Sequence, residues 1–228
     1  MTSLAVITGA SRGIGRAAAL AFARRGCGVA LLGNPGASLE QAACEVRALG
    51  AVGRAFACDV STVAGVERAA SDVLSSLGVP RAIVNNAGVV RRGPLVHETT
   101  PEDWDHVLAV NLRGPFLVSR AFLPSMLAAG RGRFVHVASI SATLGSPGAA
   151  SYAASKWGLV GFAKSLAEEL RGTGLQSIAI LPGSVDTDML AGSGFAPQMS
   201  ADDVAGMIVH AALDAPSAIN GSAIEMFG

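Results

Sequence analysis

The chain has 228 residues, half of them apolar, and its 17 basic side chains balance 17 acidic ones. This length suits one α/β domain with its own core. The balanced charge gives no basic face of the kind that binds nucleic acid or an anionic membrane. We therefore expect small, uncharged partners.

The cysteines and histidines show no metal-binding pattern. Cys27, Cys44 and Cys58 are odd in number, lack ligand-like spacing and lie among alanine and valine, so we expect buried free thiols in a reducing compartment. The four histidines are widely separated, and no metal site is expected. The apolar run at residues 4–8 is too short for a signal peptide or a membrane span. These observations predict a cytoplasmic protein.

Short apolar runs alternate with helix-length amphipathic segments along the chain. Seven runs are typical of buried parallel strands, at residues 4–8, 28–32, 54–57, 82–85, 134–138, 177–181 and 222–226. Helices are predicted over residues 13–25, 38–49, 63–77, 101–129, 151–171 and 201–213. Pro115 and Pro124 are expected to break or bend the fourth helix. The alternation predicts one doubly wound α/β domain.

A glycine-rich turn, Thr-Gly-Ala-Ser-Arg-Gly-Ile-Gly, follows the first expected strand at residues 8–15. Glycines let the backbone approach a pyrophosphate, and a helix amino end offers unpaired N–H groups. Glycine also serves tight turns and close packing, but the position between strand and helix favours a nucleotide site. The residues expected to line it are Gly9, Ser11, Arg12, Gly13, Ile14 and Gly15.

Later turns are expected to extend this site along one edge of the sheet. Asp59 follows the third strand, where it can accept from an adenine amino group or serve as a helix cap. Asn86 and Gly88 follow the fourth strand, as cofactor contacts or as ordinary turn residues.

The turn after the second expected strand bears on the choice between NADP(H) and NAD(H). An NAD-selective site places an acid about ~20 residues beyond the glycines, whereas this chain has Gly33 and Asn34 there and no carboxylate before Glu40. Arg12, just before Gly13 in the glycine-rich turn, is the candidate to attract a 2′-phosphate, although a plain surface arginine is the alternative. The pattern favours NADP(H) as cofactor.

The stretch from Ser139 to Lys156 carries the expected chemistry. Tyr152, the only tyrosine, stands four residues before Lys156, one of two lysines, and this spacing places both on one helix face. An ammonium at about 4 Å supplies about 4 kcal/mol at an effective dielectric of about 20, which is enough to bring a phenol from a pKa near 10 toward neutrality. Tyr152 would then exchange a proton, and Ser139 would hold a substrate oxygen. An unrelated tyrosine, a solvated lysine and a loop serine are the alternative.

Together these motifs resemble the short-chain dehydrogenase/reductase family over essentially the whole chain. The matching motifs are Thr8 to Gly15, Asp59-Val60, Asn85-Asn-Ala-Gly88, Asn111 in Val-Asn-Leu, Ser139, Tyr152-x-x-x-Lys156 and Pro182-Gly183. The sequence is most similar to bacterial 3-oxoacyl-thioester (acyl-carrier-protein) reductases and related ketone reductases. The resemblance implies a Rossmann-type parallel sheet in the order 3-2-1-4-5-6-7, with helices on both faces and one NAD(P)-binding domain over residues 1–228.

The same resemblance implies a catalytic tetrad of Asn111, Ser139, Tyr152 and Lys156. Tyr152 would give the proton as hydride moves from the nicotinamide to the carbonyl carbon, while Ser139 orients the carbonyl oxygen. Lys156 would lower the pKa of Tyr152 and hold the nicotinamide ribose, and Asn111 would position a water that links Lys156 to solvent. Further cofactor contacts are implied at Asn34, Val60, Asn86, Ala87, Gly88, Pro182, Gly183, Val185 and Thr187, the last two reaching the carboxamide.

The expected activity is NADPH-dependent reduction of a 3-oxoacyl thioester or a small ketone. An NAD-dependent alcohol dehydrogenase of the same family and a non-catalytic nucleotide sensor remain alternatives. Residues 187–200 are short for a substrate lid, and the chain lacks the family's common Gly-Gly terminus. A homodimer or homotetramer is implied, with an interface over residues 111–129 and 152–170. Met189, Phe195 and Trp157 are candidates for the pocket, the core or the interface.

Three arginines suggest a carrier-linked substrate. Arg131, Arg133 and Arg171 lie near presumed helix ends, where they would steer an acidic acyl carrier. Ordinary solvated surface charge is the alternative.

Overall fold

The computed structural model describes residues 3–228. Seven strands form one parallel sheet in the order β3-β2-β1-β4-β5-β6-β7, which confirms the expected topology. They are β1 (Leu4–Thr8), β2 (Gly28–Gly33), β3 (Gly53–Ala57), β4 (Ala82–Asn85), β5 (Gly132–Val137), β6 (Leu175–Pro182) and β7 (Ala223–Met226). All seven predicted strands are present, with ends shifted by at most two residues.

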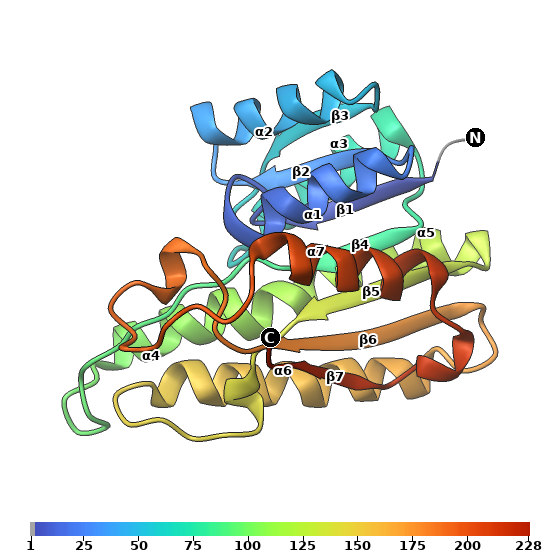
Figure 1. The fold of residues 1–228 in the computed structure, drawn as a ribbon. Coiled ribbons are helices and arrows are strands. Elements are labelled where there is room, and N and C mark those ends of the chain that lie inside the picture. Colours follow the sequence, from blue (N-terminus) through green and yellow to red (C-terminus); the bar gives the residue numbers. More distant parts are fainter. Residues whose placement is uncertain (1–2) are drawn as a thin grey trace.

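Helices cover both faces of the sheet (Figure 1). One face packs against α1 (Gly13–Arg24), α2 (Ala37–Ala48) and α7 (Ala201–Val209). The other packs against α3 (Val63–Leu77), α5 (Gly114–Ala129) and α6 (Ala150–Glu169). Every residue of β1 and β2 is buried, as expected of parallel strands covered on both sides.

The predicted helix over residues 101–129 is divided in the structure. It begins as α4 (Pro101–Leu108), passes through a π-helical turn at Ala109–Arg113, and continues as α5. Pro115 lies in the first turn of α5 and has no N–H, so the carbonyl of Asn111, four residues earlier, lacks its ordinary helical donor. Pro124 lies inside α5, which continues to Ala129. The chain is therefore interrupted at the first proline and not broken at the second.

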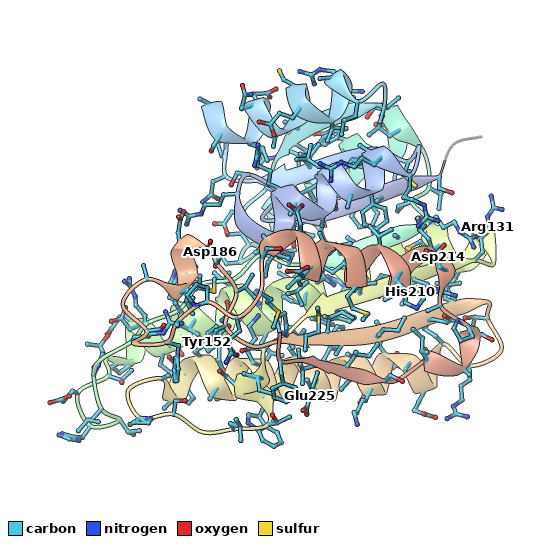
Figure 2. The ribbon with its side chains drawn as sticks, in the orientation of Figure 1. Arg131, Tyr152, Asp186, His210, Asp214 and Glu225 are labelled. Atoms are coloured by element: carbon cyan, nitrogen blue, oxygen red, sulfur yellow. The ribbon has the colours of Figure 1, made fainter. Side chains whose placement is uncertain are left out.

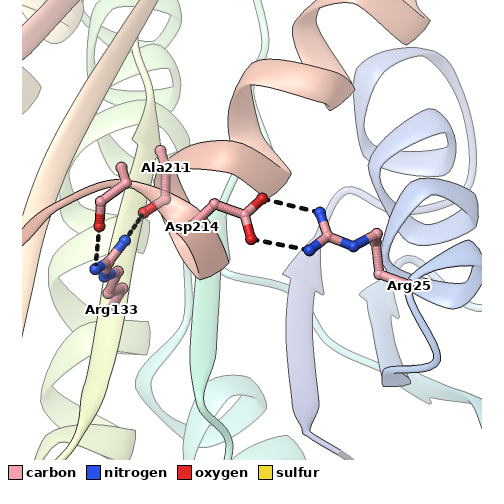
Figure 3. Close-up of polar contacts among 5 residues, drawn as sticks. Arg25, Arg133, Ala211 and Asp214 are labelled. Atoms are coloured by element: carbon pink, nitrogen blue, oxygen red, sulfur yellow. Dashed lines mark hydrogen bonds and ion pairs between the residues drawn. The ribbon is translucent and has the colours of Figure 1, made fainter.

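Two arginines hold the carboxyl end of the last helix (Figure 3). After α7 the chain makes a π-helical turn at His210–Asp214, and Asp214 accepts two hydrogen bonds from Arg25, at 2.8 and 2.9 Å. Arg133 donates to the carbonyls of Ala211 and Ala215, at 2.7 and 2.6 Å. Carbonyls at a helix end have no partner within the helix, so Arg133 serves as their cap.

One cysteine lies elsewhere than expected. Cys27 and Cys58 are buried free thiols, but Cys44 on α2 is exposed. The expectation was wrong because apolar neighbours in sequence do not determine which side of a helix faces solvent.

Over residues 3–228 no group of three potential ligands is arranged to hold a metal ion. Within the same described range, no helix combines the length and the apolarity that crossing a membrane requires.

Candidate active site

The glycine-rich turn packs closely against the turn that follows β4. Gly9 and Gly13 have φ values of 63° and 52°, a region that favours glycine. A Cβ on Gly9 would lie 2.8 Å from the Cα of Ala87, and a Cβ on Gly15 would overlap the Gly9 carbonyl and lie 2.5 Å from Asn86 Nδ2. Side chains are therefore excluded where the two turns meet.

Thr8 and Asn86 hold these two turns together. Thr8 Oγ1 accepts from the N–H groups of Asn86 and Ala87, both at 3.0 Å, and donates to the carbonyl of Val84 at 3.3 Å. The Asn86 side chain donates to the carbonyls of Thr8 at 2.9 Å and Gly9 at 3.3 Å. Thr8 was not predicted as a site residue, because its role depends on contacts with residues about 76 positions away in sequence.

The amino end of α1 suits the phosphates of a dinucleotide. No side chain among the described residues caps this helix, and its first turn carries no acid. The first N–H groups of a helix have no partner within it, and the helix dipole favours an anion there. Gly13 and Ile14 therefore lie where a pyrophosphate would bind, whereas Gly15 is buried against the turn after β4.

Arg12 already has a partner in the structure. Its Nη1 lies 3.2 Å from Oδ2 of Asp188, and both side chains are more than three quarters exposed. Asn34 is exposed directly after β2. Both residues are accessible to a cofactor, and Asp188 is a competitor for Arg12 that the sequence did not indicate. Ser11 belongs to the same glycine-rich turn.

Asp59 shapes the turn before α3. Its Oδ1 accepts from the N–H and the hydroxyl of Ser61, at 2.9 and 2.7 Å, and Thr62 caps the helix by accepting from the N–H of Gly65. The side chain of Val60 is buried. A turn role for Asp59 is thus visible in the structure, whereas its contact with adenine stays a prediction.

Tyr152, Lys156 and Ser139 come together at the carboxyl end of β5. Lys156 Nζ donates to the Val137 carbonyl at 2.8 Å and lies 5.6 Å from the centre of the Tyr152 ring. Ser139 Oγ accepts from the N–H of Ser141 at 3.1 Å, and Ser139 lies close enough to Tyr152 to act on its pKa. Figure 2 shows Tyr152 at the end of the sheet opposite Arg131.

Burial governs the protonation of this pair. It raises the pKa of Tyr152, while the hydrogen bond to Ser139 and the charge of Arg92 act to lower it. Burial lowers the pKa of Lys156 to about 8. Desolvation, which opposes the charged form, is thus the largest influence on the phenol, and the expectation that Lys156 lowers the pKa of Tyr152 stays a prediction.

The Asn111 side chain makes three hydrogen bonds to protein groups. Its Oδ1 accepts from the N–H of Val89 at 2.8 Å, and its Nδ2 donates to the Val89 carbonyl at 2.8 Å and to Ser155 Oγ at 3.0 Å. Ser155 Oγ in turn donates to the Tyr152 carbonyl at 2.7 Å. Asn111 thus ties the loop after β4 to the helix that carries Tyr152. Pro115 cannot donate to the main-chain carbonyl of Asn111, and the predicted role of Asn111 in positioning a water stays a prediction.

Gly88 lies between these groups. A Cβ on Gly88 would lie 3.4 Å from Asn111 Oδ1 and 3.7 Å from Lys156 Nζ. Gly88 thus lies directly beside the lysine, where the predicted ribose contact would be made.

The segment after β6 approaches the glycine-rich turn. Gly183 donates its N–H to the Met226 carbonyl at 2.8 Å, and Val185 is buried and paired with Met199. Thr187 lies beside Gly13, where a Cβ would be 3.3 Å from Thr187 Cγ2. Pro182, Gly183, Val185 and Thr187 thus lie at the predicted edge, with the side chain of Val185 in the core.

The remaining candidates divide by exposure and position. Met189, Phe195 and Trp157 are 36%, 67% and 55% exposed, so none of them belongs to the core. Arg131 lies at the end of the sheet opposite Tyr152 (Figure 2). Arg133 is engaged with helix carbonyls, and Arg171 pairs with Glu168. The three arginines do not line the catalytic end of this chain, so they do not support a carrier docking beside Tyr152 within one subunit.

Comparison with known proteins identifies the family. A model of the short chain dehydrogenase family matches residues 3–197. The chain belongs to the short-chain dehydrogenase/reductase family. A short chain dehydrogenase of Pseudocercospora fijiensis (strain CIRAD86) is 42% identical over 81% of this chain, which spans 60% of that protein. The 3-oxoacyl-(acyl-carrier-protein) reductase of Escherichia coli (strain K12) is 33% identical over 99% of this chain and 96% of its own.

The solved structures of this family agree with the fold. Levodione reductase superposes with a TM-score of 0.94 and 27% identity, over 99% of this chain and 96% of its own. The Rossmann-like fold predicted from the sequence is thus confirmed. Membership of the family makes the protein an oxidoreductase that uses a nicotinamide cofactor and acts on a small molecule.

Proposed function

We propose that the protein is an NADP(H)-dependent reductase that converts a carbonyl compound to an alcohol. The observation that carries the proposal is the convergence of Ser139, Tyr152 and Lys156 at the carboxyl edge of the sheet. This edge also carries the glycine-rich turn and the uncapped amino end of α1. A complete set of polar groups in this arrangement favours an enzyme over a nucleotide sensor.

Each polar group has a separate task in the proposed reaction. Nicotinamide supplies the hydride to the carbonyl carbon when the cofactor is bound. Ser139 donates to the substrate oxygen and orients it, and Tyr152 transfers its proton to that oxygen as negative charge develops. Burial keeps Tyr152 protonated, as a proton donor must be. Lys156 binds the nicotinamide ribose and stabilises the phenolate left after transfer.

Selectivity for NADP(H) is proposed from the groups around the adenosine site. Arg12 is exposed at the amino end of α1, and no carboxylate stands where an NAD-selective enzyme places one after β2. A charge-assisted bond to a 2′-phosphate is worth about 1.5 to 3 kcal/mol, or roughly ten- to a hundredfold in affinity. We expect a selectivity at the lower end of this range, because the residue after β2 is Asn34 and not a second basic residue.

A homo-oligomer is proposed from the surface formed by α4, α5 and α6. A groove of ≈ 510 Å³ there is lined by Leu108, Leu112, Phe116 and Phe162, among others. Phe116, which is 46% exposed, contributes to this apolar groove, and contiguous apolar patches of this kind mark protein–protein contact sites. This agrees with the interface predicted from residues 111–129 and 152–170.

A cytoplasmic location also stays a prediction.

The experiment that tests the function follows oxidation of NADPH and of NADH against a carbonyl panel. It includes acetoacetyl thioesters in free and carrier-linked form, diacetyl, cyclic ketones and quinones. Turnover with NADPH preferred supports the proposal, and preference for NADH with alcohols would favour the dehydrogenase alternative. Tight cofactor binding without turnover of any carbonyl or alcohol would favour the sensor. Equal rates at low salt on free and carrier-linked thioesters would count against a carrier.

A further inference from the structure

Arg92 stands on the loop between β4 and α4, close to the proposed reaction centre. One end of this stretch is held at Val89 by two hydrogen bonds with Asn111, both 2.8 Å. The other end is held where Gly93 donates its N–H to the Gly148 carbonyl at 3.0 Å. Gly148 lies four residues before Tyr152 in sequence. Arg92 is therefore carried by a short stretch fixed to two elements of the site.

A third element holds the guanidinium itself. Arg92 Nη1 donates to the Met189 carbonyl at 2.6 Å, on the segment after β6. A guanidinium has five N–H donors, so this bond leaves four for other acceptors. The side chain is exposed, and its positive charge partly opposes the rise that burial causes in the pKa of Tyr152. Arg92 is thus oriented by the protein and still open to a ligand.

The neighbouring acids are paired elsewhere. Asp188 pairs with Arg12, Asp103 pairs with Arg91 at 3.0 Å, and Glu98 accepts from the N–H of Leu95 at 2.8 Å. Across residues 3–228 no carboxylate lies within ion-pair distance of Arg92. The adjacent Arg91 has an ordinary surface pair, whereas Arg92 keeps a free charge next to the site.

We propose that Arg92 binds an anionic group of the substrate, so that the natural substrate is an oxo acid and the product a hydroxy acid. This inference rests on the function proposed above and narrows its substrate class. The carbonyl is held at Ser139 and Tyr152 while the carboxylate accepts two hydrogen bonds from the planar guanidinium, a geometry that arginine favours. The balanced net charge of the chain led us to expect uncharged partners. A net charge, however, does not reveal a single unpaired charge beside the site.

The test compares oxo acids with their methyl esters. The panel contains 2-, 3-, 4- and 5-oxo acids, each beside its ester, with NADPH at low salt. Wild type, Arg92→Gln and Arg92→Lys are measured, with Arg91→Gln as the matched control on the same loop. We expect wild type to prefer an acid over its ester in kcat/KM, and Arg92→Gln to reduce that acid-to-ester ratio ten- to a hundredfold, the value of one charge-assisted contact. Arg92→Lys should retain part of the ratio, and Arg91→Gln should change it less than about threefold.

A binding measurement keeps the test independent of turnover. Calorimetric titration of each oxo acid into the NADP⁺-loaded protein should give binding to wild type that Arg92→Gln weakens by the same factor. Circular dichroism and NADPH titration show whether the variant is folded. An unchanged acid-to-ester ratio in Arg92→Gln, a general preference for esters, or the absence of acid binding to wild type would overturn the inference. If the proposed function itself is wrong, the result differs: neither the oxo acids nor their esters are reduced.

Discussion

Asp188→Asn is expected to tighten NADPH binding, although the residue was not expected to touch the cofactor. Arg12 is the residue proposed to bind the 2′-phosphate. Its guanidinium forms an ion pair with the carboxylate of Asp188, with 3.2 Å between Nη1 and Oδ2. A phosphate must displace this carboxylate and then remains near its negative charge. Asparagine removes both penalties and keeps the shape of the side chain.

The size of the effect follows from the exposure of the pair. The side chains are 78% and 77% exposed, and exposed ion pairs are worth about 0.2–1 kcal/mol. Removing the competitor should therefore lower the Kd for NADPH by about 1.4- to 5-fold. NADH lacks the phosphate, so its Kd should change by less. Because salt screens exposed charges, the gain should shrink between low salt and about 0.5 M.

The assay is calorimetric titration of NADPH and NADH into four proteins, which are wild type, Asp188→Asn, Arg12→Ala and the double variant. Arg12→Ala should weaken NADPH roughly tenfold and NADH much less. In the Arg12→Ala background, Asp188→Asn should have little effect, since the competition it relieves is gone. Asp186→Asn is the matched control, because this exposed acid on the same segment has no bond to Arg12.

Four results would refute the reasoning. Equal tightening of NADPH and NADH by Asp188→Asn would point to a general charge effect, and an equal gain from Asp186→Asn would do the same. Persistence of the gain without Arg12 would show that the ion pair is not the cause. Equal loss of both cofactors in Arg12→Ala would remove Arg12 from the 2′-phosphate site.

Three further predictions concern buried groups. Tyr152→Phe should lower kcat at least ~100-fold, with the Kd for NADPH measured by fluorescence nearly unchanged, since it removes only the transferable proton. Lys156→Ala should reduce both kcat and cofactor affinity, in the same two assays, because one ammonium serves both. His136 is fully buried, and its pKa is lowered to about 3. Below about pH 6.5 its imidazole therefore binds a proton in the unfolded chain but not in the folded protein. Stability is then present above that pH and lost as the pH falls, by about 2 kcal/mol between pH 8 and 5, and urea unfolding should show a smaller loss for His136→Gln.

Each of these predictions has its own control and contrary outcome. Most of the wild-type activity in Tyr152→Phe would remove it as proton donor. Lys164→Ala, on the exposed side of the same helix, should leave both assays unchanged, and unaltered cofactor affinity in Lys156→Ala would remove the ribose contact. For the acid effect, His97→Gln replaces an exposed histidine and should keep the full wild-type loss. An equal loss in His136→Gln would assign the acid sensitivity to other groups.

The sequence predicted the features that depend on local pattern. Buried strands show as short apolar runs and turns show through glycine and proline, so all seven strands and the division near Pro115 could be anticipated. The sheet order came from the family resemblance. Contacts between distant segments could not be read in this way. The bonds of Thr8 to the turn after β4 and of Asn111 to Ser155 exist only once the sheet has brought those segments together.

The pKa of Tyr152 could not be predicted for a different reason. The argument from spacing counted the attraction of one ammonium and left out the cost of removing a charge from water. In the structure, that cost falls on both partners, raising the pKa of the phenol and lowering that of the lysine. Spacing on a helix gives proximity but not solvation, which depends on everything that covers the pair.

The placement of Lys156 also explains why this position holds a lysine in a chain that otherwise uses arginine for most of its positive charge. A buried guanidinium would need acceptors for five N–H groups and would stay charged, whereas an ammonium needs three and shifts its pKa when buried. One donor is taken by the Val137 carbonyl, and Gly88 lies directly beside the lysine. With its pKa lowered to about 8, Lys156 can give up a proton near neutral pH. Pro115 cannot donate to the main-chain carbonyl of Asn111, and we expect that carbonyl to hold the water that would return the proton from solvent to the lysine and on to Tyr152.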